Sequence, residues 1–124
     1  MATTVNAGPE QVNITGIRAG DRNELLVTIT NDGVPMDLTG GTVRAQARAK
    51  STSPSAIDAV VTAADETKGQ YLLAWPGDKV RQLLGAAETW TGVWDLEVVE
   101  AEQTIPITVA TGSFQAFMDV TRDA

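Results

Sequence analysis

The side chains that could do chemistry in this chain are carboxylates, because the sequence contains neither histidine nor cysteine. Histidine is the usual general base at neutral pH, and both residues are common zinc ligands. Their absence excludes thiol catalysis and zinc sites of the Cys/His kind. The serines at positions 51, 53, 55 and 113 lie in no nucleophile-elbow motif, and no histidine can activate them.

Two carboxylate pairs are spaced closely enough to be considered for acid–base catalysis. They are Asp32 with Asp37, and Asp65 with Glu66. Asp32 and Asp37 are also hard oxygen ligands of the kind calcium prefers, although their spacing matches no calcium loop. Both pairs fall at turn signals, where acidic residues are common for backbone reasons. We therefore expect no enzyme activity, no metal site and no cofactor.

The first acidic pair lies in the stretch NDGVPMDLTGG, residues 31–41, which has the composition of a turn. Asparagine and aspartate tolerate left-handed backbone geometry, glycine supplies positive φ, and proline cannot donate to a sheet. An aspartate here can accept backbone N–H bonds while the leucine after it enters the core. We predict a structural turn, with a contact role as the alternative, formed by Asp32, Gly33, Pro35, Asp37, Leu38 and Gly40.

The elements that position these residues are mostly strands, because apolar side chains recur at every second position. Leu25, Val27 and Ile29, for example, share one face of a strand. Turn signals separate such segments at intervals typical of a sandwich. The sequence predicts an all-β fold, an antiparallel immunoglobulin-like β-sandwich of about seven or eight strands with one short helix. Three tryptophans are predicted to lie in its core: Trp75, Trp90 and Trp94.

The period of two is broken at two places. Apolar residues at positions 80, 83 and 84 form one helical stripe, so we predict a helix of about two turns, capped by Asp78 and ended by Gly85. Near the C-terminus the apolar residues change from odd to even positions. A shift of one residue moves every side chain to the other face, so we predict a bulge or turn at Gly112–Ser113.

The charge pattern limits the kind of partner. The net charge of −7 repels nucleic acid and anionic lipid, and no apolar run is long enough to cross a membrane. We expect no nucleic-acid and no membrane partner. Arg44, Arg48 and Lys50 share one face of the strand predicted after Gly41. This basic row either solvates an outer sheet face or docks onto an acidic partner surface.

The length of 124 residues is that of one domain. The first residues, MATTVNAGPEQ, are small and polar. We predict a flexible N-terminal arm over residues 1–11, followed by a β-sandwich domain over residues 12–124. The arm is our candidate for contact with a partner, through Thr3, Thr4, Val5 and Asn6.

An ordered set of short motifs in this chain resembles a family of phage proteins. The motif AGD at residues 19–21 precedes DGVPMDLTG at 32–40 and VRAQAR at 43–48. A Gly-x-Tyr strand at 69–71 leads to the short helix, WDLEV follows at 94–98, and DVTR lies at 119–122. In this order, over about residues 12–122, the chain resembles the N-terminal domain of the upper baseplate protein of tailed bacteriophages and related small virion proteins.

The resemblance implies a structural role in the virion of a tailed phage. In upper baseplate proteins this domain anchors a longer chain that carries receptor-binding machinery. This sequence ends at Ala124, so we expect an accessory subunit. Our main expectation is a capsid decoration (minor capsid) protein that binds the major capsid protein or another virion structural protein. It would form a trimer or other symmetric ring and pass through the host cytoplasm during assembly.

Two alternatives remain open at the level of sequence. One is a baseplate or tail-tip subunit, which needs the same stable sandwich with an adhesive edge. The other, more remote, is a carbohydrate-binding module, because many such modules are β-sandwiches. That alternative requires an aromatic ring exposed for stacking on sugar, and Trp75 and Trp90 are the candidates.

Overall fold

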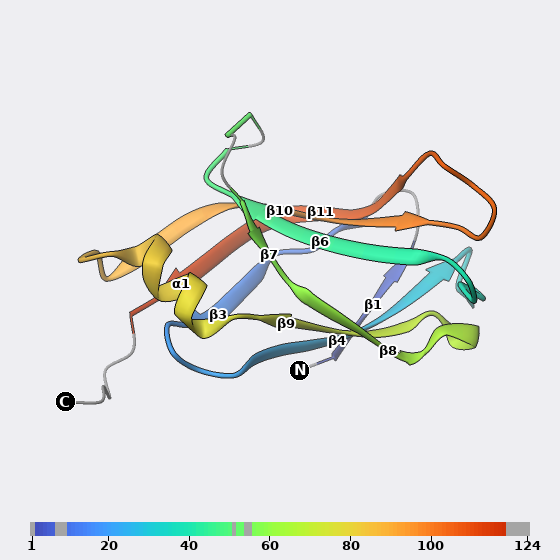
Figure 1. Ribbon diagram of the computed structural model, residues 1–124, viewed down its shortest axis with the longest axis horizontal. Coiled ribbons are helices and arrows are strands. Elements are labelled where there is room, and N and C mark those ends of the chain that lie inside the picture. The colour runs from blue at the N-terminus through green and yellow to red at the C-terminus, as the bar shows by residue number, and fades with distance from the viewer. Residues whose placement is uncertain (1, 7–9, 51, 54–55, 119–124) are drawn as a thin grey trace.

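The computed structural model describes residues 2–6, 10–50, 52–53 and 56–118, which fold into two packed sheets with a helix at one end (Figure 1). The first sheet has the spatial order β1-β4-β9-β8, with β5 paired to β4. Its strands are β1 (Ala2–Asn6), β4 (Asn23–Asn31), β5 (Val34–Pro35), β8 (Val60–Asp65) and β9 (Gln70–Trp75).

The second sheet has the spatial order β2-β11-β10-β6-β7, with β3 paired to β11. Its strands are β2 (Glu10–Gln11), β3 (Ile14–Arg18), β6 (Thr42–Arg48), β7 (Ile57–Asp58), β10 (Thr89–Val99) and β11 (Ile107–Phe117). Two helical segments, η1 (Glu66–Lys68) and α1 (Gly77–Leu84), connect strands. The prediction of an all-β sandwich with one short α-helix is confirmed. There are more strands than predicted because β2, β5 and β7 have two residues each.

The alternation of side chains in the sequence decides which face of each strand is buried. In β6, Val43, Ala45 and Ala47 are buried while Arg44 between them is exposed. β6 pairs antiparallel with β10, and β10 pairs antiparallel with β11. These long strands form the centre of the second sheet and present a polar outer face.

The edges of the sandwich are formed by segments that cross from one sheet to the other. β1 pairs parallel with β4 in the first sheet, and the chain then pairs parallel with β11 in the second sheet through β2 and β3. At the opposite edge, β7 pairs with β6 and the chain continues directly into β8, which pairs with β9 (Figure 1). At both edges the chain pairs with one sheet and then crosses over to pair with the other. The two sheets are therefore joined by the backbone as well as by side-chain packing.

The N-terminal segment is where the structure differs most from the sequence prediction. We predicted a flexible arm over residues 1–11, but residues 2–6 and 10–11 are strands within the sandwich, while residues 1 and 7–9 lie outside the described part. Val5 is fully buried, and the Thr30 hydroxyl donates to the Asn6 side-chain oxygen at 3.0 Å. The arm prediction is therefore wrong for these residues, because one apolar residue and a parallel backbone ladder suffice to dock the segment on β4.

The bulge in the last hairpin lies three residues earlier than predicted. Leu96 pairs with Ala110 and Glu97 pairs with Thr108, so Val109 is the extra residue. Val109 and Ala110 are consequently both buried, which is the signature of a bulge. β11 runs unbroken through Gly112, where a Cβ atom would overlap the carbonyl oxygen of Val12.

The helix α1 covers one end of the sandwich (Figure 1). It begins at Gly77 with Pro76 at the N-cap position and no side-chain cap, so the predicted capping role of Asp78 is wrong. Asp78 instead lies in the first turn, where its negative charge interacts favourably with the positive end of the helix dipole. Val80 and Leu84 are buried. In the described part of the chain, no helix is long and apolar enough to span a membrane.

Aromatic rings join the two sheets at the centre of the core. Trp75 comes from β9, and its ring centroid lies 6.4 Å from that of Trp94 on β10 and 4.9 Å from that of Phe114 on β11, both in edge-to-face arrangements. Trp75 and Trp94 are almost fully buried. Trp90 is only partly buried, and its ring packs edge-on against Phe114 at 5.9 Å.

Candidate functional site

The turn between β4 and β6 is held by its own backbone and by η1. Asp32 and Gly33 adopt positive φ angles of 52° and 78° and reverse the chain between β4 and β5. One oxygen of Asp37 accepts from both the backbone N–H and the hydroxyl of Thr39, and these hydrogen bonds lower the pKa of the Asp37 carboxyl. Leu38 is buried, and its N–H donates to the Glu66 carbonyl at 2.8 Å.

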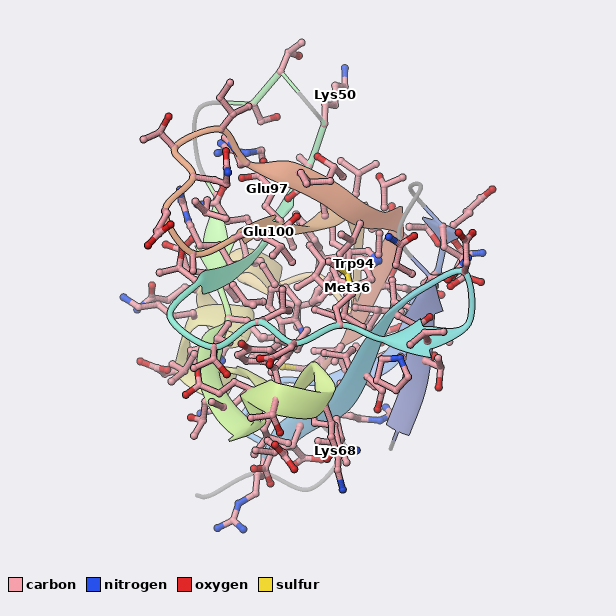
Figure 2. The ribbon with its side chains drawn as sticks, turned by 90° about the vertical axis from the view of Figure 1, so that its right-hand side faces the viewer. Met36, Lys50, Lys68, Trp94, Glu97 and Glu100 are labelled. Carbon is pink, nitrogen blue, oxygen red and sulfur yellow. The ribbon has the colours of Figure 1, made fainter. Side chains whose placement is uncertain are left out.

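The remaining turn residues close this corner of the sandwich. Pro35 is exposed and lies on β5, which pairs only with the end of β4. A proline, which has no backbone N–H to donate, is tolerated on such an edge strand. Gly40 has a φ of 81°, and Gly41 lies so close to the Val99 carbonyl that a Cβ atom would clash. Figure 2 looks onto this end, with Met36 near its centre. Each of these residues therefore has a structural role.

One member of each acidic pair is engaged in a local turn. Asp65 repeats the arrangement of Asp37, because its oxygen accepts from the N–H and the hydroxyl of Thr67. Asp37 and Asp65 thus each close an Asp-x-Thr turn. Within the described residues, no group of three or more acidic side chains is placed to hold a metal ion.

Only part of the predicted basic row lies on one strand face. Arg44 is exposed on β6 and lies opposite Glu97 of β10. The Arg48 guanidinium is used within the chain, since it donates to the Ser53 carbonyl at 2.7 Å and to the Gln46 side chain at 3.0 Å. Lys50 does not share the strand face as predicted, because β6 ends at Arg48 and the chain bends before Lys50.

A shallow hollow of ≈ 180 Å³ lies on the outer face of the second sheet, beside Arg48. It is lined by Gln46, Arg48, Val93, Trp94, Asp95 and Thr111. Partial burial raises the pKa of the Asp95 carboxyl, Glu97 adds to the rise, and Arg48 and Arg44 offset part of it. The hollow is small compared with the sites that enclose small-molecule ligands.

The predicted N-terminal contact residues lie along one edge of the first sheet. Thr4 is exposed, Thr3 is half-buried and Val5 is fully buried. The Asn6 side-chain oxygen accepts from Thr30 and from the Gly33 N–H, so it fastens the end of β1 to the β4–β5 turn. Val5 therefore packs in the core, Asn6 is exposed but bonded within the fold, and Thr4 is exposed.

The tryptophans offer little surface for stacking on a sugar. Trp75 is 1 % exposed, so neither face of its ring can reach a ligand. Trp94 donates its indole N–H to the Val12 carbonyl at 2.7 Å and is 2 % exposed. The half-buried ring of Trp90 packs on Phe114. The condition that we set for the carbohydrate-binding alternative, an exposed ring in a groove, is not met by Trp75.

The sequence analysis missed the tip of the β10–β11 hairpin as a surface. The chain turns at residues 100–103, where the Gln103 N–H donates to the Glu100 carbonyl at 3.1 Å. Just beyond this turn, Ile105 is 77 % exposed and Ile107 is 45 % exposed. The available signal was the pair of isoleucines around a proline in an otherwise polar tip, which the period of two assigned to a core face.

Comparison with known proteins places the fold. No family model matches this chain, and no curated protein matches it. Among solved structures it is similar to the N-terminal domain of phage TP901-1 ORF48, with a TM-score of 0.53 and 12 % sequence identity. The chain has the fold of that phage domain. The similarity covers 96 % of this chain and 99 % of the other, so the two domains correspond almost from end to end.

This similarity agrees with the resemblance seen in the sequence. The solved neighbour is a domain of a phage protein, and the sandwich predicted from the sequence is the one observed. At 12 % identity the shared feature is the fold. The site residues of this chain therefore have to be judged from their own contacts.

Proposed function

We propose that the protein is a non-enzymatic structural component of a tailed-phage virion. The observation that carries the proposal is the fold, which corresponds over 96 % of the chain to a domain of a phage protein. The ordered motifs around DGVPMDLTG, residues 32–40, support the same assignment independently. The protein would work by adhesion, holding other virion proteins through its surface.

The physical properties of the domain suit this role. The aromatic cluster and the crossing edge segments give a rigid body without disulfides or metals. Asp37 and Asp65, one from each acidic pair considered for catalysis, are engaged in turns. A body of this kind can be repeated in many copies on a symmetric particle, as a trimer or another ring.

For the position in the particle, we propose a decoration protein on the capsid surface, bound to the major capsid protein. The second candidate is a baseplate or tail-tip subunit, which is favoured by the motifs shared with upper baseplate proteins. Both roles require the same sandwich, so the difference lies in which partner surface the domain meets. Neither role requires nucleic acid or a membrane.

The decisive measurement is the copy number in purified particles of the phage that encodes the protein. Quantitative mass spectrometry against the major capsid protein gives this number directly. Hundreds of copies are expected for a capsid decoration protein, and a few dozen or fewer indicate a tail or baseplate subunit. Absence of the protein from the particles would overturn the virion assignment as a whole.

A further inference from the structure

The tip of the β10–β11 hairpin forms a small groove with two polar and two apolar residues in its lining. The groove, called here the hairpin groove, has a volume of ≈ 270 Å³ and is lined by Glu100, Gln103, Ile105 and Ile107. Ile105 is the most exposed of the large apolar residues in the described part of the chain, at 77 %. Covering Ile105 and Ile107 with the apolar side chain of a partner would recover the free energy of burial that their exposure forgoes.

The groove is held in place by the sandwich. Val98 pairs with Ile107 at the base of the hairpin, and the last pair between β10 and β6 joins Val99 to Thr42. Gly41 packs directly against the Val99 carbonyl, which fixes the neighbouring loop to the hairpin. A partner would therefore meet a largely preformed surface and lose less conformational entropy on binding.

The chain that forms the rim of the groove is acidic, and Glu100 belongs to the lining itself. Residues 97–107 contain three glutamates and no lysine or arginine. Glu97 faces Arg44 across the strands, but Glu100 and Glu102 lie beyond the end of the β6 pairing. The ion pair found in the described residues joins Arg22 and Glu24 at a different place. In the end-on view, Lys50 and Lys68 lie at opposite margins of the molecule, with Glu100 between them (Figure 2).

A second copy of this chain carries the same net charge of −7, so its surface as a whole repels the acidic groove. In the predicted basic row of a second copy, the Arg48 guanidinium is bonded to Ser53 and Gln46, and Arg44 lies opposite Glu97. We therefore expect the positive charge that complements the groove to come from another protein. Complementary charge selects and orients a partner, while the buried apolar anchor supplies affinity.

We propose that the hairpin groove is the docking site for a second virion protein, which presents lysine or arginine side chains around an apolar side chain. This inference rests on the proposed virion function and specifies its contact surface. The partner's apolar side chain would cover Ile105 and Ile107, and its cations would meet Glu100 and Glu102.

The first test measures incorporation of variants into particles of a phage that lacks the gene, supplied with the protein in trans. Ile105→Asp is expected to reduce the copies per particle about tenfold or more, because it places a charge on the apolar anchor. Val60→Asp is the matched control, since Val60 is also an exposed apolar residue, at 58 %, but lies on β8. Thermal melting establishes that both variants are folded.

Charge reversal tests the acidic rim separately. The double variant Glu100→Lys, Glu102→Lys is expected to lower incorporation. Asp21→Lys, Glu88→Lys makes the same change in net charge at exposed positions near α1, at the other end of the sandwich, and should leave incorporation unchanged. If both groove variants enter particles as well as the wild type, the docking proposal is overturned while the virion function stands. If the wild type itself is absent from particles, the virion function and this inference fall together.

Zero-length carbodiimide cross-linking of particles then identifies the occupant, because this reagent joins a carboxylate to an amine in direct contact. We expect links from Glu100 or Glu102 to a lysine of another virion protein. Labelled and unlabelled copies are mixed so that links between copies can be recognised. Links to a lysine of a second copy, in place of another protein, would overturn the assignment of a foreign partner.

Discussion

At the scale of single residues, Trp94 shows how one side chain fastens several parts of the chain. Its ring packs on Trp75 across the sheets, and its indole N–H donates to the Val12 carbonyl, in the segment between β2 and β3. Trp94→Ala is expected to lower the free energy of unfolding by about 3–5 kcal/mol, because it opens a large cavity. Trp94→Phe should cost less, about 1–3 kcal/mol, mainly through the unpaired carbonyl.

Chemical denaturation measures both changes. Thr91→Ala, which trims an exposed side chain on the same strand, serves as the control. An effect of Trp94→Ala below about 1 kcal/mol would contradict the packing described for the core.

A second residue-scale prediction concerns the pH dependence of stability. Burial raises the pKa of the Asp95 carboxyl, so the folded protein holds this proton more tightly than the unfolded chain does. The linked stabilisation is complete below the unfolded pKa, near 3.8, and is lost as the pH rises through the higher folded value. Asp95→Asn removes the titrating carboxyl and so avoids this loss of stability. The melting temperature of the variant, minus that of the wild type, should therefore increase as the pH is raised from about 4 to about 7.

The comparison needs melting curves at several pH values. Glu88→Gln removes one carboxylate from an exposed position near the other end of the strand and controls for the change in net charge. A difference between Asp95→Asn and the wild type that stays constant with pH would show that the carboxyl of Asp95 is not responsible.

At the scale of elements, β1 is an integral strand of the first sheet, paired with β4. Val5 is fully buried beside β4, so Val5→Asp places a charge in the core and is expected to cost on the order of 3–5 kcal/mol. Thr4→Asp adds the same carboxylate at the exposed neighbouring position and should change stability little. Equal, small effects of both changes in a denaturation experiment would mean that β1 is not docked in solution.

The elements also show what the sequence could and could not predict. Strands such as β4 and β6 could be predicted because each has one more exposed face and one buried face, and this produces the period of two in the sequence. The turn at residues 31–41 was readable because its chemistry is local. β1 was missed because its residues, ATTVN, carry no local signal strong enough, and its pairing depends on β4, more than twenty residues away.

The position of the bulge was missed for a related reason. The change of parity occurs at Val109, but Ala110 is small and Gly112 has no side chain, so the sequence shows the change only at Phe114. The hairpin groove was missed because Ile105 and Ile107 continue the apolar period beyond the point where the sandwich ends. Pattern alone records which side chains are apolar, whereas the topology decides which of them have anything to pack against.

At the scale of the whole molecule, the two sheets should unfold together. The aromatic cluster joins β9 to β10 and β11, and both edges are closed by segments that pair first with one sheet and then with the other. Neither sheet can therefore lose its order while the other keeps its core. We expect a single cooperative transition in which tryptophan fluorescence, which reports the core, and far-ultraviolet circular dichroism, which reports the strands, have the same midpoint.

The Val5→Asp variant sharpens this last prediction, because it weakens one edge of one sheet. If the edge is coupled to the whole, the variant lowers the midpoint of both signals equally and the transition stays single. If the first sheet can come apart alone, the two signals should no longer share a single midpoint. Coincident transitions in both proteins would show that the two sheets, with their edges, form one cooperative unit.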